Sequence, residues 1–226
     1  MSLLRQAGRV AWKDLRIELR SKEIIYTMVF FGALIVIIFT IAFPRDVRLA
    51  RGAAPGMLWS AIAFTGTIGL GRAFDREREN DTMRALLLSP APRLAIFFGK
   101  AIGICALVIL VTFVCTFLLS LLLGLSFFAH PLPLACALLL GAIGFSNVGT
   151  VFAATLLKVR SRDVLFPVIV YPLLVPMFIM GLYATDYLIA EKPNLDAAWE
   201  WIGFLGIYNG AFLVVSVWTF ESVVIE

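Results

Sequence analysis

Long apolar runs alternate with short polar segments along the whole chain. A helix needs about 20 apolar residues to cross the hydrocarbon core of a bilayer, which is roughly 30 Å thick. The runs that approach or exceed this length are 24–43, 55–74, 96–125, 131–157, 164–187 and 199–222. The pattern predicts an all-α membrane protein, in which six transmembrane helices form a single transmembrane domain over residues 1–226.

The first 23 residues have a different pattern, in which apolar and basic positions each recur at helical spacing. The apolar positions are Leu4, Ala7, Gly8, Ala11, Trp12, Leu15 and Leu19, and the basic ones are Arg5, Arg9, Lys13, Arg16 and Arg20. Such a pattern predicts an amphipathic helix that lies in the membrane interface, with its basic side toward the lipid headgroups. A solvated leader is the alternative.

The distribution of basic residues predicts the orientation of the spans, because loops rich in Lys and Arg stay in the cytoplasm. Six spans place both termini on one side, and fifteen of the nineteen Lys and Arg residues fall on that side. Both termini are therefore expected in the cytoplasm. The three arginines of residues 44–54 are the discordant feature, because they follow the first span on the opposite side.

The composition supports a membrane protein and excludes several kinds of chemistry. The chain is 61% apolar and 15% charged, whereas soluble domains average about half apolar and a quarter charged. The net charge of +4 comes from residues that flank apolar runs, so it predicts the lipid membrane as a partner and not nucleic acid. Three cysteines without metal-site spacing and the lone His130 predict no metal site.

The spans carry almost no groups for chemistry of their own. Their interiors hold no Asp, Glu, Lys or Arg, whereas ion pathways and proton relays need such residues. No phosphate-binding loop of the GxxxxGK[ST] type is present, and no polar segment is long enough for a nucleotide-binding domain. We therefore expect no enzyme activity in this chain. If the protein uses ATP and Mg²⁺, another subunit binds them.

Prolines and glycines predict special packing within the spans. Pro167, Pro172 and Pro176 predict a kinked or broken fifth span, which could line a path, form a hinge or be tolerated without a function. The GxxxG pairs Gly99/Gly103 and Gly206/Gly210 predict close helix packing, with a homodimer face as a further use.

The polar stretch at 75–93 combines dense mixed charge with a short apolar run. Residues 80–82 can cap a short helix, and Ser89-Pro90 would end it. Met83, Leu86 and Leu87 would form an apolar stripe suited to docking into the groove of a cytoplasmic partner. A solvated charged connector is the alternative.

Four stretches of the chain, taken in order, resemble a known family. They are WKDLRIELR at 12–20, LW at 58–59 leading to RAF at 72–74, ERENDTMRALLLSP at 77–90 followed by GK at 99–100, and RSRDVLFPV at 160–168 with YPLLVP at 171–176. The third stretch looks like the coupling-helix region of ABC exporter permeases. Together the four resemble the CcmB family, the haem-exporter permeases of bacterial cytochrome c maturation.

The resemblance implies the fold of an ABC exporter permease, a homodimer in the bacterial inner membrane, and haem as the substrate. The partners that it implies are the ATPase CcmA, the haem-handling membrane protein CcmC and the haem chaperone CcmE. It assigns ATPase coupling to Asp75, Arg76, Glu77, Arg78, Glu79, Thr82, Met83, Leu86, Leu87, Ser89 and Pro90, and a secondary cytoplasmic contact to Arg160, Arg162 and Asp163. A scaffold that only gathers assembly factors, and an ABC permease for lipid, polysaccharide or drug, are the alternatives.

Overall fold

The protein is entirely helical in the part that a computed structural model describes, which is residues 3–43, 47–79, 92–156, 159 and 162–223. The helices follow in the order α1 (Leu3–Ser21), α2 (Glu23–Ala42), α3 (Val47–Glu79), α5 (Arg93–Leu123), the short 3-10 turn η1 (Phe127–Ala129), α6 (Pro131–Thr155), α7 (Arg162–Ile189) and α8 (Leu195–Val223). Within α2, α3, α5, α6, α7 and α8 lie six segments that are long and apolar enough to cross a membrane, which confirms the predicted fold class.

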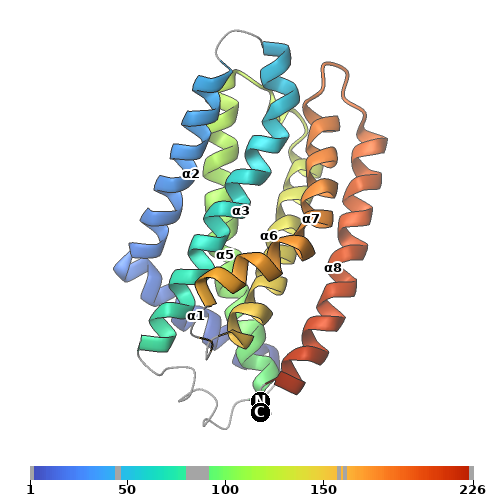
Figure 1. The fold of residues 1–226 in the computed structure, drawn as a ribbon. Helices are drawn as coiled ribbons and strands as arrows, with labels where there is room; N and C mark the ends of the chain where they lie inside the picture. The colour runs from blue at the N-terminus through green and yellow to red at the C-terminus, as the bar shows by residue number, and fades with distance from the viewer. Residues whose placement is uncertain (1–2, 44–46, 80–91, 157–158, 160–161, 224–226) are drawn as a thin grey trace.

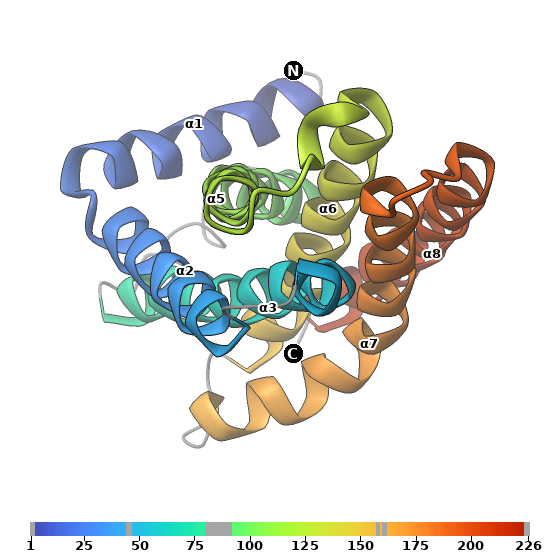
Figure 2. The ribbon, with the colours of Figure 1, turned by 90° about the horizontal axis from the view of Figure 1, so that it is seen from above.

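The six long helices run side by side, alternating in direction (Figure 1). We call the end at which α1 lies and α8 ends the basal end, and the opposite end, where α2 ends and α3 begins, the distal end. Seen along the bundle, α1 lies crosswise beside α5 while the spans are viewed end-on (Figure 2). This crosswise position is the one expected of a helix in the membrane interface.

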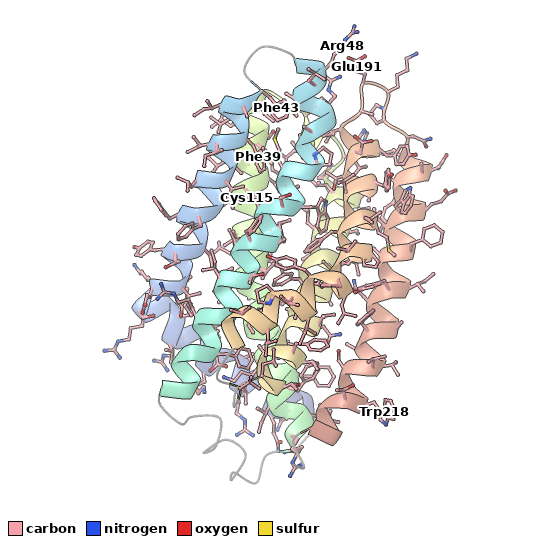
Figure 3. All side chains as sticks on the ribbon, viewed as in Figure 1. Phe39, Phe43, Arg48, Cys115, Glu191 and Trp218 are labelled. Atoms are coloured by element: carbon pink, nitrogen blue, oxygen red, sulfur yellow. The ribbon has the colours of Figure 1, made fainter. Side chains whose placement is uncertain are left out.

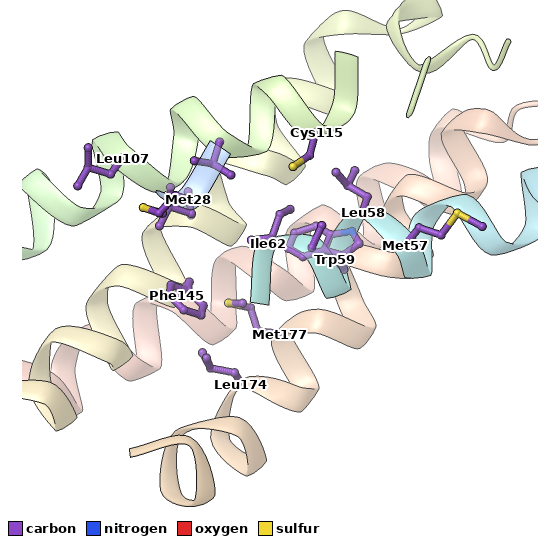
Figure 4. Close-up of a cluster of buried hydrophobic side chains, with 14 of the residues drawn as sticks. Met28, Met57, Leu58, Trp59, Ile62, Leu107, Cys115, Phe145, Leu174 and Met177 are labelled. Carbon is purple, nitrogen blue, oxygen red and sulfur yellow. The ribbon is translucent and has the colours of Figure 1, made fainter. Parts of the chain in front are cut away.

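The core lies where α3, α5 and α6 meet, with α2, α7 and α8 around them. In the apolar segments of α3 and α6, 67% of the residues are buried in the protein, whereas only 22% are buried in those of α2 and α8. Figure 4 shows part of the buried cluster, in which Met28, Ile62, Phe145 and Met177 come from four different helices. Many large apolar side chains are exposed, Phe30, Leu121 and Ile207 among them. Figure 3 labels another exposed one, Trp218, near the end of α8. An apolar exterior of this kind suits contact with lipid chains.

The second membrane-crossing helix differs from the expected span of 55–74. It begins at Val47, so most of the segment 44–54 is helical, with Pro55 inside the helix. Helix-favouring Arg, Leu and Ala residues fill 48–54 and outweigh the single backbone hydrogen bond that Pro55 removes. At 1.5 Å per residue, the 33 residues of α3 extend about 50 Å and exceed the roughly 30 Å hydrocarbon core.

The glycine pair Gly99/Gly103 of α5 packs against α1 of the same chain, so it is not an open dimerisation face. Ala7 and Ala11 of α1 are buried, and a Cβ on Gly99 would lie only 2.9 Å from the carbonyl oxygen of Ala7. Beside Gly99, the buried Lys100 Nζ lies 2.9 Å from Asp14 Oδ2. The expected amphipathic character of the helix is confirmed, because the basic residues Arg5, Arg9, Arg16 and Arg20 are exposed.

Part of the predicted apolar stripe of α1 faces away from the protein. The side chains of Trp12 and Leu19 are 64% and 57% exposed, although both were expected on the apolar face with Ala7 and Ala11. Ala7, Ala11 and Val10 pack against α5, because Gly99 brings the two helices into close contact. The larger apolar residues are left to contact lipid, where tryptophan is common at the membrane–water interface.

The connection between α1 and α2 is a tight elbow. Lys22 adopts a left-handed conformation with φ 58°, which turns the chain between the two helices. The buried carboxylate of Glu18 accepts hydrogen bonds from the backbone N–H groups of Ile24, at 2.7 Å, and Ile25, at 3.3 Å. A carboxylate at a helix N-terminus satisfies free N–H groups and complements the helix dipole. Glu18 therefore fixes the angle between the crosswise helix and the first span.

We expect Gly99→Ala to destabilise the protein and Gly103→Ala to be tolerated. A Cβ on Gly99 would lie 2.5 Å from Val10 Cβ, so α1 would have to move, whereas the nearest atom to a Cβ on Gly103 is 3.8 Å away. Overpacking of this kind costs about 1–3 kcal/mol. Both substitutions add the same helix propensity, so the difference between their thermal unfolding midpoints in detergent isolates the clash. Equal midpoints would show that the stability of the protein does not depend on the close contact between α1 and Gly99.

Candidate functional site

The residues predicted to couple to an ATPase begin on a helical extension of α3. Residues 75–79 were expected in a loop, but α3 continues through them to Glu79 at the basal end. Arg72 precedes this extension, and its Nη1 lies 3.4 Å from Glu23 Oε1 at the start of α2. Such an exposed ion pair contributes about 0–1 kcal/mol. Asp75, Arg76, Glu77, Arg78 and Glu79 thus stand on an extension that is continuous with a membrane-crossing helix.

The remaining predicted contacts are only partly within the described residues. Thr82, Met83, Leu86, Leu87, Ser89 and Pro90 lie outside them, as does Arg160. Arg162 and Asp163 form the first turn of α7, at the same basal end as Glu79. The structure therefore brings the basal ends of α3 and α7 to one end of the bundle, where α1 also lies.

The fifth span, α7, contains Pro167, Pro172 and Pro176 and bends strongly. Figures 1 and 2 show its first part running across the bundle and its second part running along it. A proline inside a helix removes one backbone hydrogen bond and displaces the carbonyl of the residue four positions earlier. The predicted kink is therefore present, within one continuous helix.

Tyr208 of α8 supports the bend of α7. Its hydroxyl donates a hydrogen bond to the carbonyl oxygen of Leu173, which lies three residues before Pro176. Pro176 removes the backbone hydrogen bond to the carbonyl of residue 172, so the bond to Leu173 is an additional contact beside the bend. Tyr208 holds the outer helix α8 against the bent segment through this interhelical hydrogen bond.

Trp59 of α3 is wedged between α6 and α7. A Cβ on Gly141 of α6 would lie 2.3 Å from Trp59 Cη2, and one on Gly181 of α7 would lie 2.2 Å from Cζ2. The indole Nε1–H donates a 3.1 Å hydrogen bond to the Thr185 hydroxyl of α7. The two glycines leave room for an aromatic ring that joins three helices.

A second hydrogen bond joins α3 to α7 nearer the basal end. The hydroxyls of Thr67 and Tyr171 lie 3.1 Å apart, and Tyr171 also donates to the Ala63 carbonyl at 3.5 Å. Together with the Trp59–Thr185 bond, this contact ties the two helices at two levels. Sequence reasoning did not identify either contact, although the glycines and the tryptophan were visible in the sequence.

Buried polar groups of the described residues help to connect helices. Among the described residues, no group of three or more His, Cys, Asp or Glu side chains could hold a metal ion. Apart from Glu18 and Lys100, the buried polar side chains are amides and hydroxyls, such as Asn209, whose Nδ2 donates a 2.8 Å hydrogen bond to the Leu140 carbonyl. These groups hold helices together, as is common in membranes.

These features describe a multi-pass helical membrane protein with a crosswise helix and charged helix ends at one side. A family model described as "CcmB protein" matches residues 5–224. The chain belongs to the CcmB family.

Three relatives that share the name "Heme exporter protein B" illustrate the similarity. The chain is 28% identical over 175 residues to the one from Pseudomonas aeruginosa, covering 77% of this chain and 78% of the relative. It is 27% identical over 185 residues to the one from Bradyrhizobium diazoefficiens, covering 82% and 83%. The match to the Escherichia coli K12 protein covers 41% of this chain and 44% of the relative, at 27% identity.

We expect Gly181→Ala to disturb the Trp59 wedge, with Gly56→Ala as its control. The new methyl group on Gly181 would overlap the indole ring, whereas the nearest atom to a Cβ on Gly56 is a Leu182 methyl at 4.0 Å. Overpacking should lower stability by about 1–3 kcal/mol. Tryptophan fluorescence and thermal unfolding in detergent measure both effects. If Gly181→Ala matches Gly56→Ala in both measurements, the ring does not fill this space as described.

Proposed function

We propose that this chain is the membrane permease subunit of an ABC-type haem exporter that acts in c-type cytochrome biogenesis. The observation that carries the proposal is the family match over residues 5–224, supported by relatives named heme exporter protein B. The sequence contains no nucleotide-binding loop of its own. ATP and Mg²⁺ therefore belong to a separate ATPase, haem is a substrate, and the chain itself is no enzyme and carries no cofactor.

The proposed complex contains two copies of this chain and the ATPase CcmA, together with CcmC and the haem chaperone CcmE. The resemblance of 77–90 to a coupling-helix region supports the ATPase contact. For the second copy, α8 offers a stripe of Gly203, Gly206 and Gly210, around which a Cβ would meet no atom within 4 Å. The proposed lipid environment is the bacterial inner membrane, with both termini and the basal end in the cytoplasm, an orientation that the distribution of basic residues supports.

In the proposed mechanism, closure of two ATPase subunits on ATP pushes on residues 75–90, with Arg160, Arg162 and Asp163 as a second contact. Because α3 is one helix from Val47 to Glu79, a push at its basal end reaches the distal end. The Trp59–Thr185 and Thr67–Tyr171 hydrogen bonds pass this motion to α7. The prolines of α7 then act as the hinge.

The crosswise helix α1 acts as a brace in this mechanism. Lys100 Nζ and Asp14 Oδ2, 2.9 Å apart, join α1 to the basal part of α5 where Lys100 is buried. Removing one partner of a buried ion pair typically costs about 3–5 kcal/mol. The brace therefore keeps α5 in place while α3 and α7 move.

Replacing Leu86 and Leu87 by Asp should separate the ATPase from the membrane subunit. Burying each leucine in a partner groove is worth roughly 1.5–3 kcal/mol, which a carboxylate would abolish. We expect loss of copurification with CcmA and loss of cytochrome c assembly. Replacing both residues by Met is the control, because volume-conserving apolar exchanges are tolerated. An aspartate variant that still copurifies and supports assembly would overturn this assignment.

The orientation can be tested with single cysteines at opposite ends of the bundle. In a variant in which Cys105, Cys115 and Cys136 are replaced by Ala, Ser126→Cys lies at the distal end and Ser21→Cys at the basal end. A membrane-impermeant maleimide applied to intact spheroplasts should label Ser126→Cys. Ser21→Cys should react only after permeabilisation. The reverse pattern would mean that the termini are outside the cytoplasm.

A further inference from the structure

A charged pocket lies at the distal end, far from the proposed coupling residues. It has a volume of about 390 Å³ and is lined by Arg48, Arg51, Gly52, Asp186, Ala190 and Glu191. The two arginines and Gly52 come from the first turns of α3, and the other residues come from the end of α7 and the segment that follows it. Figure 3 shows Arg48 and Glu191 close to one another at this end.

The two arginines share one carboxylate. Arg51 Nη1 lies 3.0 Å from Glu191 Oε1, and Arg48 Nε lies 4.0 Å from the same oxygen. Arg48 and Arg51 are three residues apart on a helix, so their side chains emerge on the same face. Guanidinium groups bind carboxylates well because their planar donor geometry matches the two oxygens. Glu191 therefore indicates which chemical group this pocket accepts.

The pocket also has a hydrogen-bond donor and open space that Glu191 does not occupy. Arg51 Nη1 is buried, and its contact with Glu191 is not a hydrogen bond in geometry; no partner among the described residues accepts one from it. No atom lies within 4 Å of where a Cβ on Gly52 would be. A buried guanidinium N–H without an acceptor is costly, and a ligand oxygen in the open space would remove that cost.

Glu191 is placed to leave the arginines when a competitor arrives. Its side chain is 64% exposed, and it lies outside the regular helices, between the end of α7 at Ile189 and the start of α8 at Leu195. Water can therefore solvate its carboxylate once it moves. Asp186 lines the same pocket and would repel a second negative charge, so a singly charged carboxylate fits better than a phosphate dianion.

We propose that this distal pocket binds a carboxylate group of the exported porphyrin, which displaces Glu191 from Arg48 and Arg51. The inference rests on the proposed function, since it names the part of the substrate that the distal end recognises. A propionate arm enters the pocket beside Gly52 and Ala190 while the macrocycle stays outside it. Glu191 acts as an internal competitor that occupies the arginines when no substrate is present.

The test compares haem with haem dimethyl ester, which has no free carboxylate, by Soret titration of the full-length protein in phosphatidylcholine nanodiscs. Empty nanodiscs supply the background. We expect haem to bind about tenfold more tightly than the diester, a difference of about 1.4 kcal/mol. Arg51→Gln should abolish this preference. Glu191→Gln should tighten haem binding severalfold, because it removes the competitor.

The opposite signs of these two variants distinguish a binding site from a simple structural ion pair. If the Arg51–Glu191 pair were only a latch, both variants would break it and change haem binding in the same direction. Lys192→Gln and Glu200→Gln are the matched controls, because each makes the same charge change at an exposed residue that does not line the pocket. Both should bind haem and the diester as the unchanged protein does.

Two outcomes would overturn the proposal: no preference for haem over the diester, or pocket variants that behave like their controls. The proposed permease function is tested separately by the Leu86 and Leu87 variant, which is read by copurification and cytochrome c assembly. The two proposals can therefore fail independently: the titration tests haem binding by the isolated protein, and copurification tests coupling to the ATPase.

Discussion

The ring of Trp59 fills the space between the backbones of α6 and α7, where Gly141 and Gly181 have no side chains. In lipid, no hydrophobic driving force holds apolar helices together, so close packing and interhelical hydrogen bonds must do so. Trp59 provides both, because its indole N–H also donates to Thr185. The consequence is that α3 cannot shift along its axis without displacing α6 or α7. In the proposed mechanism, this contact would pass a movement of α3 to α7.

The bend of α7 shows how the membrane constrains such a mechanism. Three prolines weaken the helix, and each freed carbonyl would be costly against lipid unless another group reaches it. The Tyr208 hydroxyl donates to the Leu173 carbonyl beside the bend. Tyr171, which lies between Pro167 and Pro172 in the sequence, forms a hydrogen bond with Thr67 of α3. The bent helix is thus supported from α8 on one side and from α3 on the other. The proposed hinge would therefore have to move together with its neighbours.

Two of the three arginines after the first span have a structural explanation; Arg45 lies outside the described residues. The three disagree with the rule that basic residues remain in the cytoplasm, yet α3 places Arg48 and Arg51 against Glu191 at the distal end. The acidic residues of the pocket offset their charge locally. The same arrangement leaves a buried Arg51 nitrogen without a hydrogen-bond acceptor among the described residues. A topology signal that seemed discordant is therefore a set of paired charges on one helix face.

The six membrane-crossing helices could be predicted from the sequence, because the length of an apolar run decides whether a segment can cross a bilayer. The sequence also predicted the amphipathic α1 and the kink of α7, since helical periodicity and proline geometry are local properties. It did not determine which surfaces meet. Gly99 and Gly103 suited a second copy of the chain as well as α1, and only the position of Ala7 and Val10 above Gly99 decided between them. The start of α3 at Val47, the Trp59 wedge and the distal pocket likewise depend on residues far apart in the sequence. Close packing between helices is a property of two surfaces, so only the tertiary structure could decide it.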